Sequence, residues 1–374
     1  MVIKVSFDMT PAIGNRTGIG NVVAHLFDSI SASDQIELAP YTLSYKARSF
    51  QNDLPDNNIF INYPASIMSL IWKYSSLGSL DKKIGNFDLW HATNYLAPPT
   101  KKPTLITIHD VTMLKYPELV PAKTRSIVPI IQKRLIDGAH VHVPAKAIKL
   151  DVLEHFENYI SDSERVHVVP FSVPELFSKH PSDYAKKLSA GDPYILSIGT
   201  LEPRKNHARL IEAFGLVHTS NPNLRLFLVG ADGPARPQVD KAMAQVGAQA
   251  RSKIVITGPV SQADRTYLLQ NSYLVAYPSL YEGFGLPLLE AMATSSPIVT
   301  TKEGSLPEVG GNAAHYVDAH SSADIARGIL EVVESEDLRV QLVEAGKHRA
   351  KQFSWSASAE MLVKVYKDVI SDKG

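Results

Sequence analysis

Residues 277–293 read Tyr277-Pro-Ser-Leu-Tyr-Glu282-Gly-Phe-Gly-Leu-Pro287-Leu-Leu-Glu290-Ala-Met-Ala293, which predicts a glycine turn followed by a helix. The preceding residues 273–276 are apolar and typical of a short buried strand. A helix is expected over 286–292, because proline suits a first helical turn. The glycines of the turn let the backbone approach a ligand and point N–H groups outward. A strand, a glycine turn and a helix N-terminus together indicate an anion site.

Two carboxylates frame this turn, Glu282 in the loop and Glu290 in the helix. Carboxylates are not required to bind an anion, but they are suited to bind the hydroxyls of a sugar or a ribose. Both could instead be ordinary surface acids on a capped helix. The Gly-Phe-Gly turn argues against that alternative, because it would expose Phe284 with no packing reason. Phosphate at the amides and hydroxyls at the carboxylates indicate a sugar nucleotide.

The spacing Glu282, seven residues, Glu290 resembles the EX7E motif of retaining glycosyltransferases, and the whole stretch resembles family 4, glycosyl transferases group 1. The resemblance implies the GT-B fold and retention of configuration. It also implies that Glu282 contacts the transferred sugar and Glu290 the ribose. The donor-binding turn would then consist of Gly283, Phe284, Gly285 and Leu286.

Composition excludes several other classes of protein. The 374 residues carry zero formal net charge, which argues against a dedicated nucleic-acid binder. The chain has no cysteine, which excludes disulfides, thiolate zinc sites and a cysteine nucleophile. We find neither a signal-peptide pattern nor an apolar run near the roughly 20 residues that span a bilayer. We therefore expect a cytoplasmic protein, with peripheral contact at the inner face of the plasma membrane left open.

The first half begins like a doubly wound sheet. A strand over 2–7 is followed by a loop over 8–17, by Gly18 and Gly20, and by a helix expected over 21–31. The two glycines could form only a tight turn. By the family resemblance, Gly18 and Gly20 would face the donor diphosphate. Relatives often have arginine where this chain has Asn21, so no role of that arginine is carried over to this chain.

His109 directly follows a predicted buried strand over 104–108. Ligands of open parallel sheets bind at the carboxyl ends of strands, where a histidine can bind a sugar hydroxyl or a phosphate. The alternative is a histidine that caps the strand and bonds Asp110. The stretch Ile-His-Asp-Val-Thr resembles a second signature of the family, so we favour a functional role.

Two segments of the first half suggest a membrane or acceptor surface. Residues 122–136 predict one amphipathic helix carrying Lys123, Arg125, Lys133 and Arg134. A basic helix can lie on an anionic membrane, although a solvated face is the commoner case. Residues 67–74, Ile-Met-Ser-Leu-Ile-Trp-Lys-Tyr, predict either a core helix or a surface that meets a lipid or a glycan acceptor.

The second half repeats the pattern. A strand over 194–199 leads into Thr200-Leu-Glu-Pro-Arg204-Lys205-Asn206, and a helix is expected from about 208. Arg204 and Lys205 would put two positive charges at a strand end, although they could be a surface pair. The stretch resembles the diphosphate loop of the family, in which many members have arginine at the position of Thr200. The resemblance also places Val260 in the loop that holds the nucleobase.

The repeated order of elements predicts an α/β protein with two Rossmann-like domains. We expect an acceptor-binding domain over 1–172, a nucleotide-sugar-binding domain over 173–353 and a C-terminal helix over 354–374. By the resemblance, the domains face each other across a donor-binding cleft, and the last helix crosses back onto the first domain.

Glycosyl transfer leaves negative charge on a diphosphate, and the chain has no Asp-x-Asp motif to hold a metal there. We therefore expect catalysis without metal or cofactor, with Arg204, Lys205 and backbone N–H groups stabilising that charge. No nucleophile is evident, so we expect a front-face mechanism. The catalytic group would comprise His109, Glu282, Arg204 and Lys205.

The variant Gly-Thr-Leu-Glu-Pro-Arg-Lys-Asn looks like that of bacterial mannosyltransferases of O-antigen and exopolysaccharide synthesis. We therefore favour GDP-mannose over UDP-glucose as donor and a lipid-linked glycan as acceptor. A nucleotide-sugar epimerase stays a rival, although its acid/base cluster is not evident. An NAD-dependent oxidoreductase fits poorly, because Gly18-Ile-Gly20 lacks a third glycine. A non-catalytic sugar-binding protein would not need Arg204 and Lys205 beside the glutamates.

Overall fold

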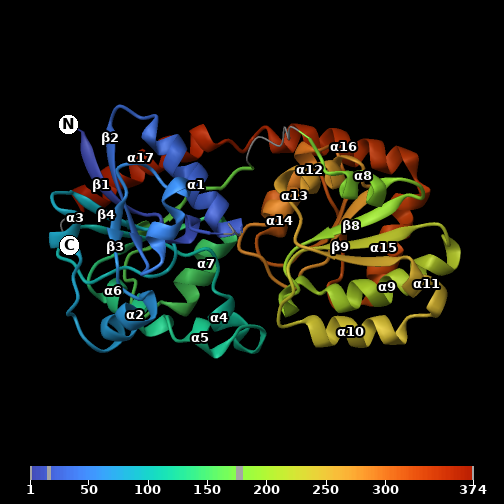
Figure 1. Ribbon diagram of the computed structural model, residues 1–374, viewed down its shortest axis with the longest axis horizontal. Coiled ribbons are helices and arrows are strands. Elements are labelled where there is room, and N and C mark those ends of the chain that lie inside the picture. The colour runs from blue at the N-terminus through green and yellow to red at the C-terminus, as the bar shows by residue number, and fades with distance from the viewer. Residues whose placement is uncertain (1, 15–17, 174–179, 373–374) are drawn as a thin grey trace. The chain divides into compact units, whose positions relative to one another are not determined.

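The computed structural model describes residues 2–14, 18–173 and 180–372, and these fold into two units (Figure 1). Unit 1 comprises Met1–Ser172 and Phe353–Gly374, and unit 2 comprises Val173–Gln352. Thr17 of the expected glycine loop and Pro174 of the expected linker lie outside the described residues.

Unit 1 is built on a seven-stranded parallel sheet. Its strands are β1 (Ile3–Asp8), β2 (Ile36–Leu43), β3 (Ile59–Ile61), β4 (Leu89–Ala92), β5 (Thr104–Thr107), β6 (His140–Val143) and β7 (Val166–Val168). Their spatial order is β3-β2-β1-β4-β5-β6-β7, so the direction of winding reverses between β1 and β4. Pro40 lies within β2.

Eight helices of unit 1 are described as α1 (Gly18–Ser31), α2 (Ala65–Tyr74), α3 (Asp81–Ile84), α4 (Thr112–Lys115), α5 (Ala122–Arg125), α6 (Val128–Ile136), α7 (Lys146–His155) and α17 (Trp355–Ser371). The C-terminal helix α17 packs against α1, as expected for a helix that returns to the first domain. Its Tyr366 hydroxyl lies 2.8 Å from Nδ1 of His91 in β4.

Two helix predictions in unit 1 were wrong in detail. The helix expected over 122–136 is two helices, α5 and α6, and Pro129 lies in the first turn of the second one. Its Arg134 is buried and pairs with Asp137 at 2.9 Å, so that cation does not face solvent. The helix expected from residue 21 already includes residues 18–20, because its described part is Gly18–Ser31.

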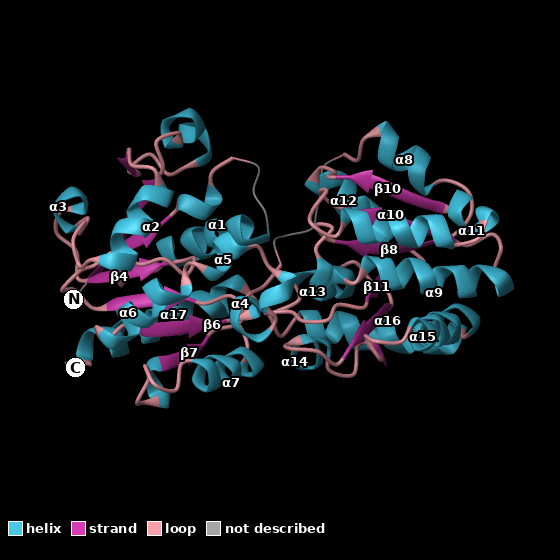
Figure 2. Cartoon of the chain, turned by 90° about the horizontal axis from the view of Figure 1, so that it is seen from below, coloured by secondary structure: helices cyan, strands magenta, loops and turns pink. Residues whose placement is uncertain are grey.

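Unit 2 contains a six-stranded parallel sheet in the order β10-β9-β8-β11-β12-β13. Its strands are β8 (Tyr194–Ile198), β9 (Arg225–Val229), β10 (Ile254–Gly258), β11 (Leu274–Tyr277), β12 (Ile298–Thr301) and β13 (His315–Val317). The direction of winding reverses between β8 and β11. All residues of β8 and β11 are buried, as apolar runs are when helices cover both faces of a parallel sheet (Figure 2).

The described helices of unit 2 are α8 (Asp183–Ser189), α9 (His207–Ser220), α10 (Arg236–Gln245), α11 (Ala248–Ser252), α12 (Gln262–Gln270), α13 (Leu286–Ala293), α14 (Leu306–Gly310), α15 (Ser322–Glu334) and α16 (Glu336–Ala350). Phe214 of α9 and Ile329 of α15 are fully buried in the core beside the sheet. Glu308 lies on α14, and its backbone carbonyl accepts a hydrogen bond from Arg349.

Candidate active site in unit 2

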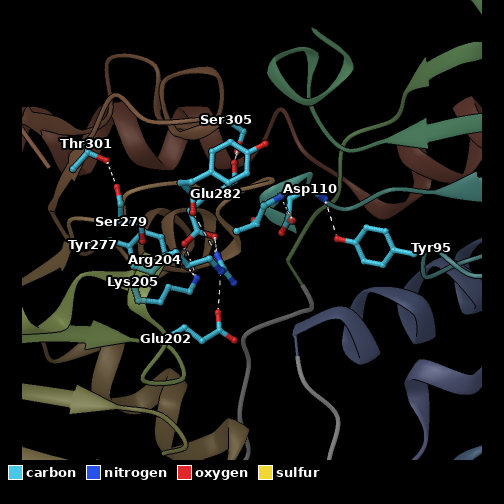
Figure 3. Close-up of polar contacts among 12 residues, drawn as sticks. Tyr95, Asp110, Glu202, Arg204, Lys205, Tyr277, Ser279, Glu282, Thr301 and Ser305 are labelled. Atoms are coloured by element: carbon cyan, nitrogen blue, oxygen red, sulfur yellow. Dashed lines mark hydrogen bonds and ion pairs between the residues drawn. The ribbon is translucent and has the colours of Figure 1, made fainter. Parts of the chain in front are cut away.

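The predicted anion-binding residues of unit 2 follow the two central strands of its sheet. Arg204 and Lys205 end the turn after β8, and Glu282 lies in the loop after β11 (Figure 3). These strands are neighbours and flank the point where the winding reverses. Open parallel sheets bind ligands outside the carboxyl ends of strands at such a switch point.

Asn206 ties the two loops together. It has a left-handed backbone, φ 62°, and its Nδ2 donates to the carbonyls of Pro278 at 3.0 Å and Ala319 at 2.7 Å. The backbone N–H of Leu280 donates to the carbonyl of Arg204 at 2.7 Å. The cations after β8 are therefore held in register with the loop that carries Glu282.

Glu282 accepts hydrogen bonds on both oxygens from basic side chains. Its Oε1 lies 2.6 Å from Lys205 Nζ and 2.8 Å from the hydroxyl of Tyr277, and Oε2 lies 2.7 Å from an Arg204 guanidinium nitrogen. Arg204 Nε also pairs with Glu202 at 2.9 Å. Lys205 Nζ additionally contacts the Tyr277 hydroxyl and lies over its ring, 4.7 Å from the centroid. The positive charges of Arg204 and Lys205 are therefore balanced by two carboxylates of the same cluster.

Burial and neighbouring charge set the ionisation of this cluster. Burial raises the pKa of Glu282, but Arg204 and Lys205 outweigh it and lower that pKa to about 2. Burial lowers the pKa of Lys205, with Arg204 adding to the effect and Glu282 opposing it. Burial and the charge of Glu282 raise the pKa of Tyr277. Glu282 is therefore a carboxylate at neutral pH, and Tyr277 a neutral phenol.

The glycine turn is a constrained entry to helix α13. Gly285 caps the helix in a left-handed conformation, φ 92°, where a Cβ would lie 2.8 Å from a methyl carbon of Leu306. The first N–H groups of a helix lack intrahelical partners and attract anions. The expectation of an exposed aromatic was wrong, since Phe284 is only 5% exposed. Its burial fixes the turn by packing.

A second loop supports Glu282 from behind. The backbone N–H and the hydroxyl of Ser305 donate to the Glu282 carbonyl at 3.1 and 3.0 Å. Gly304 has φ 58°, and a Cβ there would lie 2.5 Å from that same carbonyl oxygen. Only glycine fits this close approach, so the loop fixes the backbone that carries the carboxylate.

Glu290 lies on α13 and is 3% exposed. One of its oxygens pairs with Arg265 of α12. The other, Oε2, is buried and has no hydrogen-bond partner among the residues that the structure describes. A buried carboxylate oxygen without a donor is costly, and a ligand hydroxyl would satisfy it. Val260 follows β10 in a half-buried loop.

His109 and the two early glycines belong to unit 1 and are described within it. His109 Nε2 lies 2.9 Å from the carbonyl of Thr93, so the histidine does not cap its strand by bonding Asp110. Burial lowers its pKa to about 4, although Thr93 and Asp110 favour the charged form. His109 is therefore neutral at pH 7, with a proton on Nε2. Gly18 and Gly20 lie in the first turn of α1.

Sequence reasoning missed several residues that hold the site. Tyr277, Arg265, Gly304 and Ser305 each touch one of the two glutamates or its backbone. The position of Tyr277 at the end of a central strand could have pointed to it. Nothing in the linear spacing points to Arg265, because helix packing alone brings it to Glu290.

The fold and this site define the class of the protein. Residues 181–349, almost all of unit 2, match the family model of glycosyl transferases group 1. Residues 181–349 therefore carry a glycosyl transferases group 1 domain, and the chain as a whole has the fold of GT-B glycosyltransferases.

Two curated relatives illustrate the range of similarity. O-antigen chain mannosyltransferase B of Escherichia coli is 29% identical over 290 residues, 75% of this chain and 74% of the relative. D-inositol 3-phosphate glycosyltransferase of Corynebacterium glutamicum is 30% identical over 260 residues, 65% of this chain and 61% of the relative. Among solved structures, Anabaena HepE in complex with UDP and glucose is 17% identical with a TM-score of 0.70, covering 98% of this chain and all of that one.

Neither a membrane-spanning helix nor a metal-binding cluster is present among the described residues. Over 2–14, 18–173 and 180–372, no helix is both long and apolar enough to cross a membrane. The same residues contain no group of three or more histidines and acids placed to hold a metal ion.

Proposed function

We propose that this protein is a retaining glycosyltransferase that transfers a hexose, with mannose from GDP-mannose favoured, to a lipid-linked glycan. The observation that carries the proposal is the cation pair Arg204 and Lys205, held against Glu282 at the switch point of unit 2. An arginine and a lysine beside a helix N-terminus suit a diphosphate. The carboxylates suit sugar and ribose hydroxyls.

Each residue then has a role on the donor. Arg204 and Lys205 take the diphosphate, together with the backbone N–H groups of residues 283–286. Glu282 binds hydroxyls of the transferred sugar, and the unpartnered Oε2 of Glu290 supports a contact with the ribose. Val260 lies near the base. In unit 1, neutral His109 donates its Nε2–H to the carbonyl of Thr93, which leaves Nδ1 as an acceptor for a sugar hydroxyl and no ring N–H for a phosphate.

The reaction breaks the bond between the anomeric carbon and the diphosphate oxygen, and forms one from that carbon to an acceptor hydroxyl. In a front-face mechanism, the departing phosphate oxygen takes the acceptor proton. Negative charge grows on the phosphate, and the two cations stabilise it without a metal. Detection of a covalent sugar–enzyme adduct would count against this mechanism.

The preference for mannose as the transferred sugar is supported by the E. coli mannosyltransferase relative. A UDP-sugar is the alternative donor, supported by the HepE complex with UDP and glucose. A non-hydrolysing epimerase with the same fold is a more distant alternative. For the acceptor we propose a lipid-linked glycan bound by unit 1 during surface polysaccharide synthesis, at the inner face of the plasma membrane.

The test is release of nucleoside diphosphate from GDP-mannose and from UDP-glucose, with and without EDTA and a lipid-linked glycan acceptor. We expect release from GDP-mannose that EDTA leaves unchanged. Release from UDP-glucose alone would overturn the donor. Transfer that requires a divalent metal would overturn metal independence, and no release from either sugar would overturn the proposed activity.

A further inference from the structure

Helix α2 of unit 1 carries an exposed apolar stripe. Ile67, Leu70, Ile71 and Tyr74 are 54%, 59%, 37% and 73% exposed. At about 100° per residue, their spacing of three and four places them within an arc of about 100° on one helix face. Soluble proteins seldom leave so many large apolar side chains together in water without a function.

The stripe stays exposed because the opposite face is fixed to the fold. Met68 and Trp72 are 6% and 2% exposed, and α2 packs against α6, beside it in Figure 1. The indole nitrogen of Trp72 donates to the carbonyl of Gly78 at 3.1 Å. Gly78 has φ 84°, and a Cβ there would lie 3.2 Å from both side chains. This contact holds Leu77, 73% exposed, close to the end of α2.

Lysines outnumber acids in the segment that carries the apolar residues, with Lys73 on α2 itself and Lys82 and Lys83 on α3. Residues 60–86 contain three lysines, Lys73, Lys82 and Lys83, and a single acid, Asp81. Asp81 turns inward, since its Oδ2 accepts a hydrogen bond from the Thr100 hydroxyl at 2.9 Å and its Oδ1 is buried. Lys82 and Lys83 are exposed. We name this surface the α2 patch, comprising Ile67, Leu70, Ile71, Lys73, Tyr74, Leu77, Lys82 and Lys83.

We propose that the α2 patch docks unit 1 onto an anionic lipid bilayer. Its apolar side chains would enter the boundary between headgroups and acyl chains, while the lysines lie at the level of the phosphates. Charge favours an anionic bilayer over a second copy of the chain as the binding partner. In a two-fold contact, the lysines of the two copies would lie close together and repel each other. The proposal rests on the proposed function only in that a lipid-linked acceptor explains why the enzyme docks.

This surface differs from the one that sequence alone suggested, residues 122–136. There Arg134 is buried, and Arg125 donates to the carbonyl of Pro117 at 2.6 Å. The exposed apolar stripe lies on α2 instead. The two surfaces can be separated by mutation.

The experiment is flotation of the full chain with vesicles of phosphatidylcholine alone or with 30% phosphatidylglycerol, in the absence of nucleotide. We expect binding to the anionic vesicles that 0.5 M NaCl weakens. A triple variant Leu70→Ser, Tyr74→Ser, Leu77→Ser should lose at least about tenfold in partitioning, because the apolar contribution scales with buried area. A variant Lys73→Gln, Lys82→Gln, Lys83→Gln should lose the preference for anionic lipid.

The matched control is Leu216→Ser with Val340→Ser, which removes exposed apolar side chains of unit 2, 51% and 55% exposed. It should bind vesicles like the wild type. Full binding by the triple serine variant would overturn the proposal, as would loss of binding in Lys123→Gln, Arg125→Gln alone. A concentration-dependent dimer abolished by the serine variant, without vesicle binding by the wild type, would assign the patch to a second copy. A retained thermal shift with nucleotide separates these outcomes from misfolding and from failure of the proposed function.

Discussion

Lys205 Nζ lies 2.6 Å from Oε1 of Glu282, and both side chains are buried. Because Arg204 binds the other oxygen at 2.7 Å, one carboxylate engages both cations that we assign to the diphosphate. Glu282 thus competes with any anion for the same two cations. A donor would have to draw Arg204 and Lys205 away from it.

Because of this contact, we predict that Glu282→Gln strengthens nucleotide binding, although it removes a residue of the proposed donor site. Removing the negative charge should raise the affinity for GDP or UDP by about tenfold, because no internal carboxylate then competes for the cations. Sugar transfer should fall, since the amide is a weaker acceptor for sugar hydroxyls. Isothermal titration measures the first effect, and steady-state assays of transfer measure the second.

Glu202→Gln is the matched control, because Glu202 also pairs with Arg204 but is partly exposed. A surface pair of this kind contributes less than about 1 kcal/mol, so nucleotide affinity should change little. Weaker nucleotide binding by Glu282→Gln, with Glu202→Gln unchanged, would contradict the competition we infer.

Tyr277→Phe should destabilise the fold by about 1–3 kcal/mol, because buried Lys205 and Glu282 lose a shared hydroxyl partner. It should also alter nucleotide affinity by freeing Lys205. Tyr194→Phe is the comparison, since its hydroxyl donates to the carbonyl of Leu268 at 2.7 Å elsewhere in unit 2. Denaturant melts should show losses for both variants, and titrations a changed affinity for Tyr277→Phe alone. Equal affinities in the two variants would show that Tyr277 is merely structural.

Glu290→Gln should weaken nucleotide binding by about tenfold, because the ribose hydroxyls lose a charged acceptor. The wild type should likewise prefer GDP over 2′,3′-dideoxy-GDP by about tenfold, and the variant should not discriminate between them. Competition titrations with the two nucleotides measure both ratios. Undiminished discrimination by the variant would remove Glu290 from the ribose contact.

Lowering the pH should destabilise the folded protein at pH values well above the pKa of Glu282. Burial lowers the pKa of His109, His142, His167 and His207 to about 4. An unfolded histidine, with a pKa near 6.5, binds protons more readily, so stability falls as pH drops from 6.5 toward 4. Asp8 opposes this, because burial raises its pKa to about 6 and it releases a proton on unfolding.

Burial lowers the pKa of His91 as well, so at pH 5.5 the balance of these five histidines and Asp8 is an uptake of about three to four protons per molecule unfolded. Calorimetric unfolding in buffers of different ionisation enthalpy measures that number. Glu282 should add its own loss of stability only as pH falls from about 4.5 toward 2. Proton release on unfolding at pH 5.5 would contradict the neutral, buried state of these histidines.

The sequence allowed both parallel sheets to be predicted and pointed to Arg204, Lys205 and Glu282, which the structure brings together, because apolar strands and the Arg204-Lys205 turn are local patterns. It did not predict that Glu282 neutralises both cations, since that contact joins residues 77 and 78 positions apart. The direction in which Arg134 or Phe284 points depends on packing against distant elements. The exposed stripe on α2 was ambiguous for the same reason, because residues 67–74 fit a buried helix and an exposed one equally well.

The most direct test of the central claim is a thermal-shift titration with GDP, UDP, ADP and their common sugars, with and without EDTA. Wild type and Arg204→Ala should be compared at matched concentrations. We predict stabilisation by GDP and GDP-mannose that EDTA leaves unchanged and that Arg204→Ala reduces, together with a loss of about 2–4 kcal/mol of transition-state stabilisation in transfer by that variant. No shift with any nucleotide, or an undiminished shift in Arg204→Ala, would contradict the assignment of the unit 2 site.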